Sequence, residues 1–297
     1  MGYTTQNRLA DLLKYDLNQI VSNIETLREL DFLTKKSVQN AKIHLKVEIG
    51  TSRQGILIDN IGEYLELLKS NPKLTLAGLS THYANIEDTT DHSFAEEQLQ
   101  RFKAIDQIIS SAGFTGYIRH TACSAAAILF DETYFDMVRV GIGLYGLWPS
   151  SETRVSAKQK GVEMDLRPVL TWKTRIAHIK ELPEGSVVSY GCTEKLTART
   201  KIAILPIGYF DGCDRGLSSI GNVLVHGKRC KILGRICMDM TVIDINNIPD
   251  VKLEDEVVLL GKQGSEIIGA EEIAKKINTI NYEVVTRINP LIKRIIV

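Results

Sequence analysis

The chain has 297 residues, of which 44% are apolar and 24% charged, and lysine plus arginine equals aspartate plus glutamate at 36 each. This balance gives no electrostatic reason to expect a nucleic-acid partner or binding to an anionic membrane surface, and it favours a small neutral or zwitterionic ligand. The N-terminus does not resemble a signal peptide, no apolar run is long enough to span a membrane, and the five cysteines contain no C-x-x-C pair. We therefore expect a cytoplasmic protein without a disulfide framework or a zinc site.

The first half of the chain alternates apolar runs with amphipathic stretches. Units of about thirty residues in this order are typical of βα repeats on a parallel sheet. Helices are predicted over residues 24–40, 60–70, 94–111 and 124–130, and strands over residues 17–21, 43–49, 76–82, 117–122 and 135–140.

Five strand-helix units are visible, whereas a closed barrel needs eight. The pattern therefore predicts either a smaller open sheet or a barrel in which this chain begins at a later strand. The residues after Met1 look like the tail of an earlier strand, because no capping residue precedes the first helix-like stretch.

The pattern changes near residue 150. Residues 150–168 are polar and irregular, as expected of a linker, so we predict a first domain over 1–149 and a second over 150–297. Short β-branched runs with turn residues between them are typical of an antiparallel β domain. Strands are predicted there over residues 170–178, 186–188, 200–206, 222–225, 231–236, 241–245 and 256–260, and a helix over 270–277.

Polar residues follow the predicted strands of the first domain. In a parallel α/β barrel the C-terminal ends of the strands meet at one face, where functional side chains gather. The residues at these ends are Lys46, Glu48 and Arg53, then His82, then Cys123 and Ser124, and finally the run from Arg139 to Gly143.

Each of these residues also has an ordinary structural explanation. His82 can be a hydrogen-bonded core histidine. Lys46 and Glu48 lie two residues apart on one face of a strand, so they can form a surface pair or a polar belt beneath Arg53. Arg139 interrupts an apolar run, and it either pairs with an acidic loop residue or donates hydrogen bonds to a buried ligand atom.

The residues after Arg139 suggest a phosphate site. Gly141, Ile142 and Gly143 can present backbone N–H groups of the kind that hold a phosphate. Phosphate sites of barrels favour the loops after the last two strands, so Ser124 suits the same role if these strands are the last two.

The stretch over residues 187–215 contains Tyr190 and Tyr209, each beside a glycine. Glycine is usually kept where the backbone turns sharply or approaches something closely, which suggests a site. Tyr190 is the candidate base, although a phenol is a poor base at neutral pH unless cations or donors stabilise the phenolate. The alternative is an ordinary cross-strand aromatic.

Eight sequence motifs resemble bacterial alanine racemase, in the order of that family and from residue 2 to the C-terminus. In the first domain they are HLKVEIGTSRQG at 44–55, GLSTHYAN at 78–85, HTACSAA at 120–126 and FDMVRVGIGLYG at 135–146. In the second domain they are SYGCT at 189–193, PIGYFDGCDRGLS at 206–218, GKRCKILGRICMDMTVID at 227–244 and TINYEVVTRINP at 279–290.

The resemblance implies a pyridoxal phosphate enzyme that interconverts L-alanine and D-alanine for peptidoglycan and works as a head-to-tail homodimer. It also implies that the first domain is strands four to eight of a (β/α)8 barrel, followed by a mainly antiparallel β domain.

The same resemblance implies roles for individual residues. Tyr190 is the base for L-alanine and reaches the cofactor of the other subunit, and His82 links it to Arg139, which donates to the pyridine nitrogen. Arg53, supported by Lys46, faces the cofactor's phenolic oxygen and the substrate. The implied phosphate ligands are Ser124, Gly141, Ile142 and Tyr282, and the residues implied at the substrate carboxylate are Tyr209 and Met238 of the other subunit.

The family's Schiff-base lysine has no match in this chain. It belongs to a motif reading K-A-N-A-Y-G-H, which these residues do not contain. Smaller departures are Glu48 to Thr51 where the family usually reads D-T-G-M, Cys123 where asparagine is usual, and Glu194 where tyrosine is common. We therefore expect that this chain alone does not turn over substrate. The alternatives are a non-catalytic remnant, a subunit that lends Tyr190 to a full-length racemase in a mixed dimer, and a racemase for serine.

Overall fold

The computed structural model describes residues 2–297, which divide into two compact units. The first unit comprises the chain up to Leu144 and residues 148–165, and the second comprises residues 145–147 and 166–297. Within the described residues no helix combines the length and apolar character needed to cross a bilayer.

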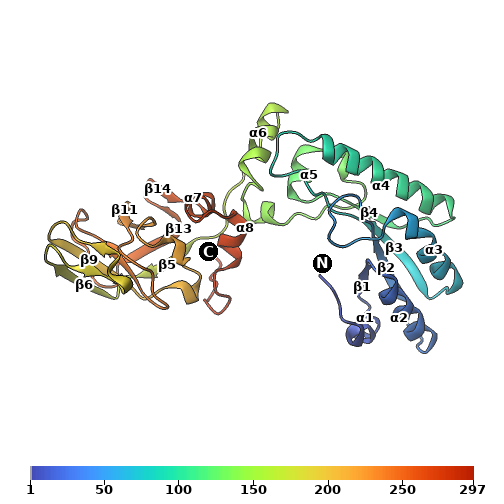
Figure 1. Cartoon of the computed structure of the whole chain (residues 1–297), viewed down its shortest axis with the longest axis horizontal. Coiled ribbons are helices and arrows are strands. Elements are labelled where there is room, and N and C mark those ends of the chain that lie inside the picture. Colours follow the sequence, from blue (N-terminus) through green and yellow to red (C-terminus); the bar gives the residue numbers. More distant parts are fainter. Residues whose placement is uncertain (1) are drawn as a thin grey trace. The chain divides into compact units, whose positions relative to one another are not determined.

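The first unit is an α/β structure in which helices alternate with strands (Figure 1). Its helices and strands are α1 (Leu9–Lys14), β1 (Asn18–Val21), α2 (Ile24–Lys35), β2 (Ala41–Lys46), α3 (Ile61–Ser70), β3 (Leu74–Ser80), α4 (Ser93–Ser111), β4 (Ile118–His120), α5 (Ser124–Leu129) and α6 (Ser151–Gln159).

The four strands form one parallel sheet in the order β1-β2-β3-β4. Along β2, Ile43 and Leu45 are fully buried in the core that also contains Leu79 of β3 and Phe102 of α4. Because side chains alternate along a strand, the residues between them point to the opposite face. The predicted parallel α/β architecture is confirmed at this level.

That opposite face carries the polar side chains. Register places His44 beside Gly78, and Gly78 beside Ile118, in one row across the sheet. The next row, one step nearer the C-terminal ends, holds Lys46, Ser80 and His120. The polar candidates on β2 and their neighbours therefore share a face and converge toward one edge.

The strand predicted over residues 135–140 is wrong. Phe135 has a positive φ of 48°, and the segment after it makes only two backbone hydrogen bonds toward β4, Asp136 N to Arg119 O and Arg139 N to Ala122 O. The segment therefore runs beside the end of β4 without forming a ladder.

The linker predicted over residues 150–168 is also wrong in its first half. α6 begins after Ser150, whose hydroxyl accepts from Thr153 N, and it buries Thr153, Ser156 and Ala157 against the first unit. The helix was missed because the residues that it buries are small and mostly polar. Residues 148–165 belong to the first unit, although we predicted that the second domain begins at residue 150.

The second unit is built from three antiparallel sheets, which confirms an antiparallel β domain. Their orders are β11-β10-β13-β14 with β5 also paired to β13, then β12-β9-β6, and then β7-β8. Its helices and strands are β5 (Trp172–Arg175), β6 (His178–Leu182), β7 (Val187–Val188), β8 (Glu194–Lys195), β9 (Thr200–Leu205), β10 (Asn222–Val225), β11 (Lys228–Lys231), β12 (Thr241–Asp244), β13 (Glu256–Gln263), β14 (Glu266–Ile268), α7 (Ala270–Lys276) and α8 (Asn281–Thr286).

Two strands of this unit differ from their predicted bounds. The run over residues 170–178 splits, because β5 pairs with β13 whereas β6 pairs with β9 in another sheet. The strand predicted over 231–236 instead lies at Lys228–Lys231, since His226 and Gly227 both have positive φ and close a two-residue hairpin that pairs Val225 with Lys228 at once.

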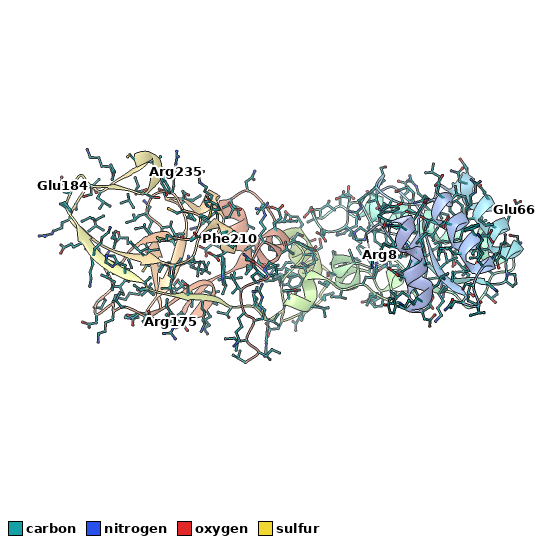
Figure 2. The ribbon with its side chains drawn as sticks, turned by 90° about the horizontal axis from the view of Figure 1, so that it is seen from below. Arg8, Glu66, Arg175, Glu184, Phe210 and Arg235 are labelled. Atoms are coloured by element: carbon teal, nitrogen blue, oxygen red, sulfur yellow. The ribbon has the colours of Figure 1, made fainter. Side chains whose placement is uncertain are left out.

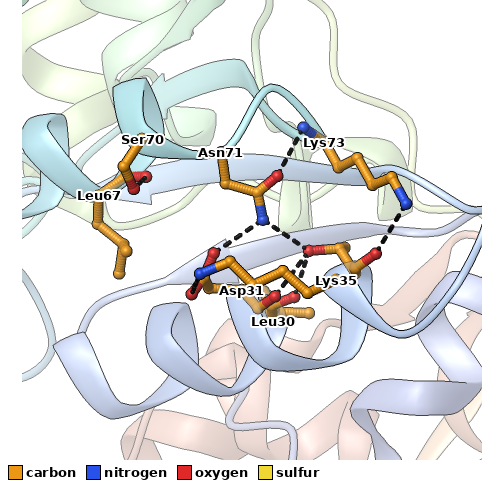
Figure 3. A network of polar contacts seen from close by, with 8 residues as sticks. Leu30, Asp31, Lys35, Leu67, Ser70, Asn71 and Lys73 are labelled. Atoms are coloured by element: carbon orange, nitrogen blue, oxygen red, sulfur yellow. Dashed lines mark hydrogen bonds and ion pairs between the residues drawn. The ribbon is translucent and has the colours of Figure 1, made fainter.

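A polar network fixes α2 to the start of β3 (Figure 3). The buried Asn71 donates from Nδ2 to Asp31 Oδ1 at 2.8 Å and to Thr34 Oγ1 at 3.1 Å, and its Oδ1 accepts from Lys73 N at 2.9 Å. Lys73 Nζ donates to the carbonyl oxygens of Thr34 in the last turn of α2 and of Ser37 just after that helix. One amide group therefore joins a helix end to the entry of a strand.

We expect Asn71→Ala to destabilise the first unit by about 1–3 kcal/mol, because buried partners of the amide lose their hydrogen bonds. The chain has two tryptophans, Trp148 in the first unit and Trp172 in the second. In a Trp172→Phe background, urea unfolding followed by fluorescence therefore reports the first unit. Ser70→Ala, at the exposed neighbouring position, is the control, and equal midpoints for the two variants would contradict the role of Asn71.

Candidate active site

Arg139 is the best-anchored polar side chain of the first unit. Its Nη1 donates to His120 O at 2.7 Å and to His120 Nδ1 at 2.9 Å, and its Nη2 donates to Thr81 O at 2.7 Å and Thr121 O at 3.0 Å. The Nε atom is buried without a partner among the described residues. The guanidinium therefore bridges the ends of β3 and β4 and retains one unused donor.

A second arginine holds the backbone that carries Arg139. Arg119 donates to the Asp136 carboxylate from its backbone N at 2.8 Å, from Nε at 2.9 Å and from Nη2 at 3.2 Å, and Asp136 N donates back to Arg119 O. The pKa of Asp136 is lowered, first by the Arg119 side chain and then by its backbone N–H. This reciprocal contact fixes the segment after residue 135 although it is not a strand.

Three cations act electrostatically on His82. Burial lowers the pKa of His82 to about 4, with further contributions from Arg139, Arg53 and Lys46. Lys46 is only 6% exposed, and its pKa is lowered by burial, then by Arg53 and Arg139, against the opposing effect of Glu48. His82 is therefore neutral at pH 7, in a region of positive potential.

The carboxylate of Glu48 is held by its own loop and does not form a simple surface pair with Lys46. It accepts from Gly50 N at 2.6 Å, Thr51 N at 2.5 Å and Arg53 N at 3.3 Å. Burial raises the pKa of Glu48, but the backbone N–H groups of this loop outweigh that effect and lower it. Thr51 Oγ1 also donates to His82 O at 2.5 Å, so the loop that carries Arg53 is tied to the end of β3.

Ser124 brings together the residues predicted for a phosphate. It is buried at the start of α5, and its Oγ accepts from Gly141 N at 3.0 Å and from Gly143 N at 3.3 Å. Ile142 between them is 4% exposed. A Cβ at Gly141 would meet no atom within 4 Å, so there is space beside these N–H groups. Because both N–H groups are donated to the hydroxyl oxygen, the Ser124 O–H is the donor left to turn toward an anion in this space.

Tyr190 lies in the second unit on a tight turn. Ser189, Gly191 and Cys192 have φ values of 63°, 75° and 51°, and the Tyr190 side chain is 71% exposed. Ser189 Oγ donates to Arg235 O, and a Cβ at Gly191 would lie 2.8 Å from Arg235 Nη1. Arg235, labelled in Figure 2, thus supports a turn that presents the phenol to solvent.

Tyr209 and Met238 are brought together by backbone contacts. Tyr209 N donates to Cys237 O at 3.0 Å and Phe210 N to Met238 O at 3.1 Å, and a Cβ at Gly208 would lie 2.2 Å from both acceptor oxygens. Tyr209 and Met238 are 44% and 53% exposed, and Phe210, labelled in Figure 2, is also exposed. The glycines beside Tyr190 and Tyr209 therefore serve a sharp turn and a close approach, as predicted.

The second unit also contains an open cleft of about 660 Å³ beside Tyr209. Arg215 and Arg287 line it, and Arg287 is paired with Asp214 at 2.8 Å. Tyr282, the predicted phosphate ligand of this unit, lies on α8 and is half-buried. No group of three or more metal-ligating His, Cys, Asp or Glu side chains occurs within residues 2–297.

The predicted site residues thus form one group in each unit. In the first unit, His82 is influenced electrostatically by Arg139, Arg53 and Lys46. Ser124 is hydrogen-bonded to Gly141, which follows Arg139 by two residues and precedes Ile142. The second unit gathers Tyr209 and Met238, and Tyr190 lies on the turn supported by Arg235. Sequence reasoning missed His120, the direct partner of Arg139, although it ends β4 within the quoted motif HTACSAA and fits the same rule for strand ends.

The sequence matches models of two family domains. Residues 1–149 match the N-terminal domain of alanine racemase, and residues 169–296 match its C-terminal domain. The alanine racemase of Leptospira interrogans is 44% identical over 257 residues, which cover 86% of this chain and 66% of that protein. That of Halothermothrix orenii is 42% identical over 294 residues, covering 99% of this chain and 76% of that protein.

Solved structures agree with the sequence matches. The structure of alanine racemase from Bacillus anthracis with bound L-Ala-P is 33% identical with a TM-score of 0.89, covering 97% of this chain and 72% of that chain. Alanine racemase from Bartonella henselae with covalently bound pyridoxal phosphate has a TM-score of 0.83 at 24% identity, which bears on the fold alone. The chain therefore spans about two thirds to three quarters of the length of these proteins.

We expect the first unit to lose stability as the pH falls from about 6.5 to about 4. His82 and His120 each have a folded pKa of about 4 against an ordinary value of 6.5, so the unfolded chain binds more protons in this window. Their neutral forms face Arg139, Arg53, Lys46 and His44. Trp148 fluorescence in the Trp172→Phe background gives the unfolding free energy at each pH.

His82→Asn removes one titrating group with a folded pKa of about 4 and serves as the comparison. The dependence of the unfolding free energy on pH should fall by about one proton in this variant. An unchanged slope would contradict the low pKa of His82.

Proposed function

The chain belongs to the alanine racemase family, and from this premise we propose that it forms part of a pyridoxal-phosphate-dependent enzyme that interconverts L-alanine and D-alanine. The observation that carries the proposal is the match of both family domains, in order, over nearly the whole chain. We propose further that β1 to β4 are consecutive barrel strands of that fold and that the protein works in the cytoplasm.

The residues of the first unit fit the cofactor. Arg139 Nε is a buried donor without a partner, suited to a ring nitrogen, because the four Nη hydrogens are already used. The Ser124 O–H beside the open space at Gly141 suits a phosphate. On the family resemblance we propose Gly141, Ile142 and Tyr282 as further phosphate ligands. The excess of positive charge around His82 also favours an anionic cofactor.

Pyridoxal phosphate, when bound, supplies the electron sink that makes the α-proton of an amino acid removable. Beside Arg139 the pyridine nitrogen of the cofactor would be an unprotonated acceptor, because arginine can only donate and does not give up its proton. Burial lowers the pKa of Arg139, while Cys123 and Tyr83 oppose that effect. Arg139 therefore positions the cofactor and does not supply the proton.

We propose that Tyr190 removes the proton from L-alanine and returns it to the same face in the reverse direction. Its exposure on a turn supports a role toward another subunit in a head-to-tail dimer. Tyr209 and Met238, also exposed and held together, are proposed to face the substrate carboxylate from the same side. Arg53, whose loop is fixed by Glu48, is proposed to face the cofactor's phenolic oxygen and the substrate.

A second candidate function is a subunit that lends Tyr190, Tyr209 and Met238 to a lysine-containing racemase in a mixed dimer. The observation that favours it is the exposure of these three side chains. Racemisation needs a second base opposite Tyr190, which in this case comes from the partner.

Replacement of Arg139 tests the cofactor site. We expect Arg139→Gln to weaken pyridoxal phosphate binding by at least about tenfold, since hydrogen bonds from a charged donor are lost. Absorbance titration of the purified chain measures the dissociation constant, and Arg28→Gln, which removes a cation from an exposed pair with Glu63, is the control. Equal affinities for the two variants would count against the assigned site.

Borohydride reduction of the same mixture tests the lysine. We expect no lysine of this chain to be trapped with pyridoxal phosphate at a single defined position, and no exchange of the α-proton of alanine. A single trapped lysine together with proton exchange would overturn this expectation.

Tyr190 is tested by co-expression with a racemase that keeps its lysine but lacks its tyrosine base. We expect this chain to restore alanine racemisation and Tyr190→Phe to reduce the restored rate by about 10²- to 10⁴-fold, the usual contribution of a general base. Tyr15→Phe, an exposed tyrosine of the first unit, is the control. No restoration by the unmodified chain would reject the lending role.

A further inference from the structure

His44 reaches across an entire strand of the parallel sheet. It lies on β2 and His120 lies on β4, so β3 separates them by two strand spacings, or about 10 Å. Even so, His44 Nδ1 and His120 Nε2 are 2.9 Å apart, and the two rings meet edge to face with centroids 5.1 Å apart.

Gly78 makes this contact possible. It is the β3 residue paired with His44 in the register, where any side chain would stand between the two histidines. A Cβ at this position would lie 2.0 Å from His44 Nδ1 and 2.5 Å from its Cε1. A real Cβ does not approach other atoms so closely, so the imidazole of His44 occupies the space that a side chain at position 78 would need.

The three side chains form a hydrogen-bond chain with a fixed direction. Arginine can only donate, so His120 Nδ1 accepts from Arg139 Nη1 at 2.9 Å. Neutral His120 then carries its proton on Nε2 and donates it to His44 Nδ1. Burial favours the neutral form of both rings, and it lowers the pKa of His120 to about 4.

We propose that His44 is a positioning residue for Arg139, acting through His120 and through the space left by Gly78. By accepting the Nε2 proton, His44 holds the His120 ring with Nδ1 toward Arg139. The ring then completes the set of four acceptors around the guanidinium and leaves Nε as the unused donor.

The proton positions are tested first, on the whole chain without added cofactor. The chain has six histidines, so ¹⁵N-histidine labelling with assignment by single substitutions is practical. We expect His120 to be protonated at Nε2 and unprotonated at Nδ1 near neutral pH. A proton on His120 Nδ1 overturns the proposal.

Matched variants separate the hydrogen bond from simple packing. His44→Asn keeps an acceptor near the position of Nδ1, whereas His44→Leu fills similar space without one. We expect the His120 Nε2 proton to exchange with water about five to ten times faster in His44→Leu than in His44→Asn. Equal exchange rates in the two variants overturn the role of His44 as acceptor.

Gly78→Ala gives an independent measurement. It should lower the unfolding midpoint in the unmodified chain, because the new Cβ displaces His44, and it should have little effect in a His44→Ala background where that space is free. Equal effects in both backgrounds contradict the proposed use of the space.

The effect on the cofactor rests on the proposed function. We expect His44→Leu to weaken pyridoxal phosphate binding about tenfold and His44→Asn to restore most of the loss. Equal affinities in both variants contradict the positioning role. Failure of the unmodified chain to bind pyridoxal phosphate rejects the proposed function instead, while the nitrogen and exchange data still decide whether the hydrogen-bond chain exists.

Discussion

The burial of one guanidinium organises the first unit. A largely buried cation is unfavourable unless most of its donors are paired, and the four Nη hydrogens of Arg139 are paired with three backbone carbonyls and one imidazole nitrogen, while Nε has no partner among the described residues. Those acceptors belong to the ends of β3 and β4, so the two strand ends, the segment anchored by Arg119 and Asp136, and the ring of His120 are positioned together. Displacement of any one of these acceptors leaves a further donor of the guanidinium unpaired.

The charges around Arg139 are mainly positive. Arg53, Lys46 and Arg139 all lower the pKa of His82, and the carboxylate of Glu48 accepts from backbone N–H groups of its own loop. A bound anion lowers the free energy of such a group of like charges. The polar face of the sheet is therefore suited to a ligand that carries its own negative charge, even though the chain as a whole is neutral.

Local pattern was sufficient for much of the fold. The alternation of strands and helices in the first half and the hairpin residues in the second predicted the architecture, and the rule for strand ends predicted the neighbourhood of His82, Arg53 and Arg139. The failures have specific causes. The segment after Phe135 is fixed by side-chain to backbone bonds, and α6 buries Thr153 and Ser156, which a hydrophobic pattern does not detect. The contact of His44 with His120 depends on an empty position on a third strand, which no short-range pattern reveals.

The support of the Tyr190 turn by Arg235 ties together two parts of the sequence that lie more than forty residues apart. Ser189 donates to the backbone at position 235, and the absence of a side chain at position 191 leaves room for the guanidinium. A substitution at position 191 therefore affects the space for the side chain at position 235, and the reverse also holds. Among relatives, a larger residue at position 191 should be accompanied by a shorter one at position 235, so that the two positions evolve as a pair and the orientation of the phenol is inherited from both.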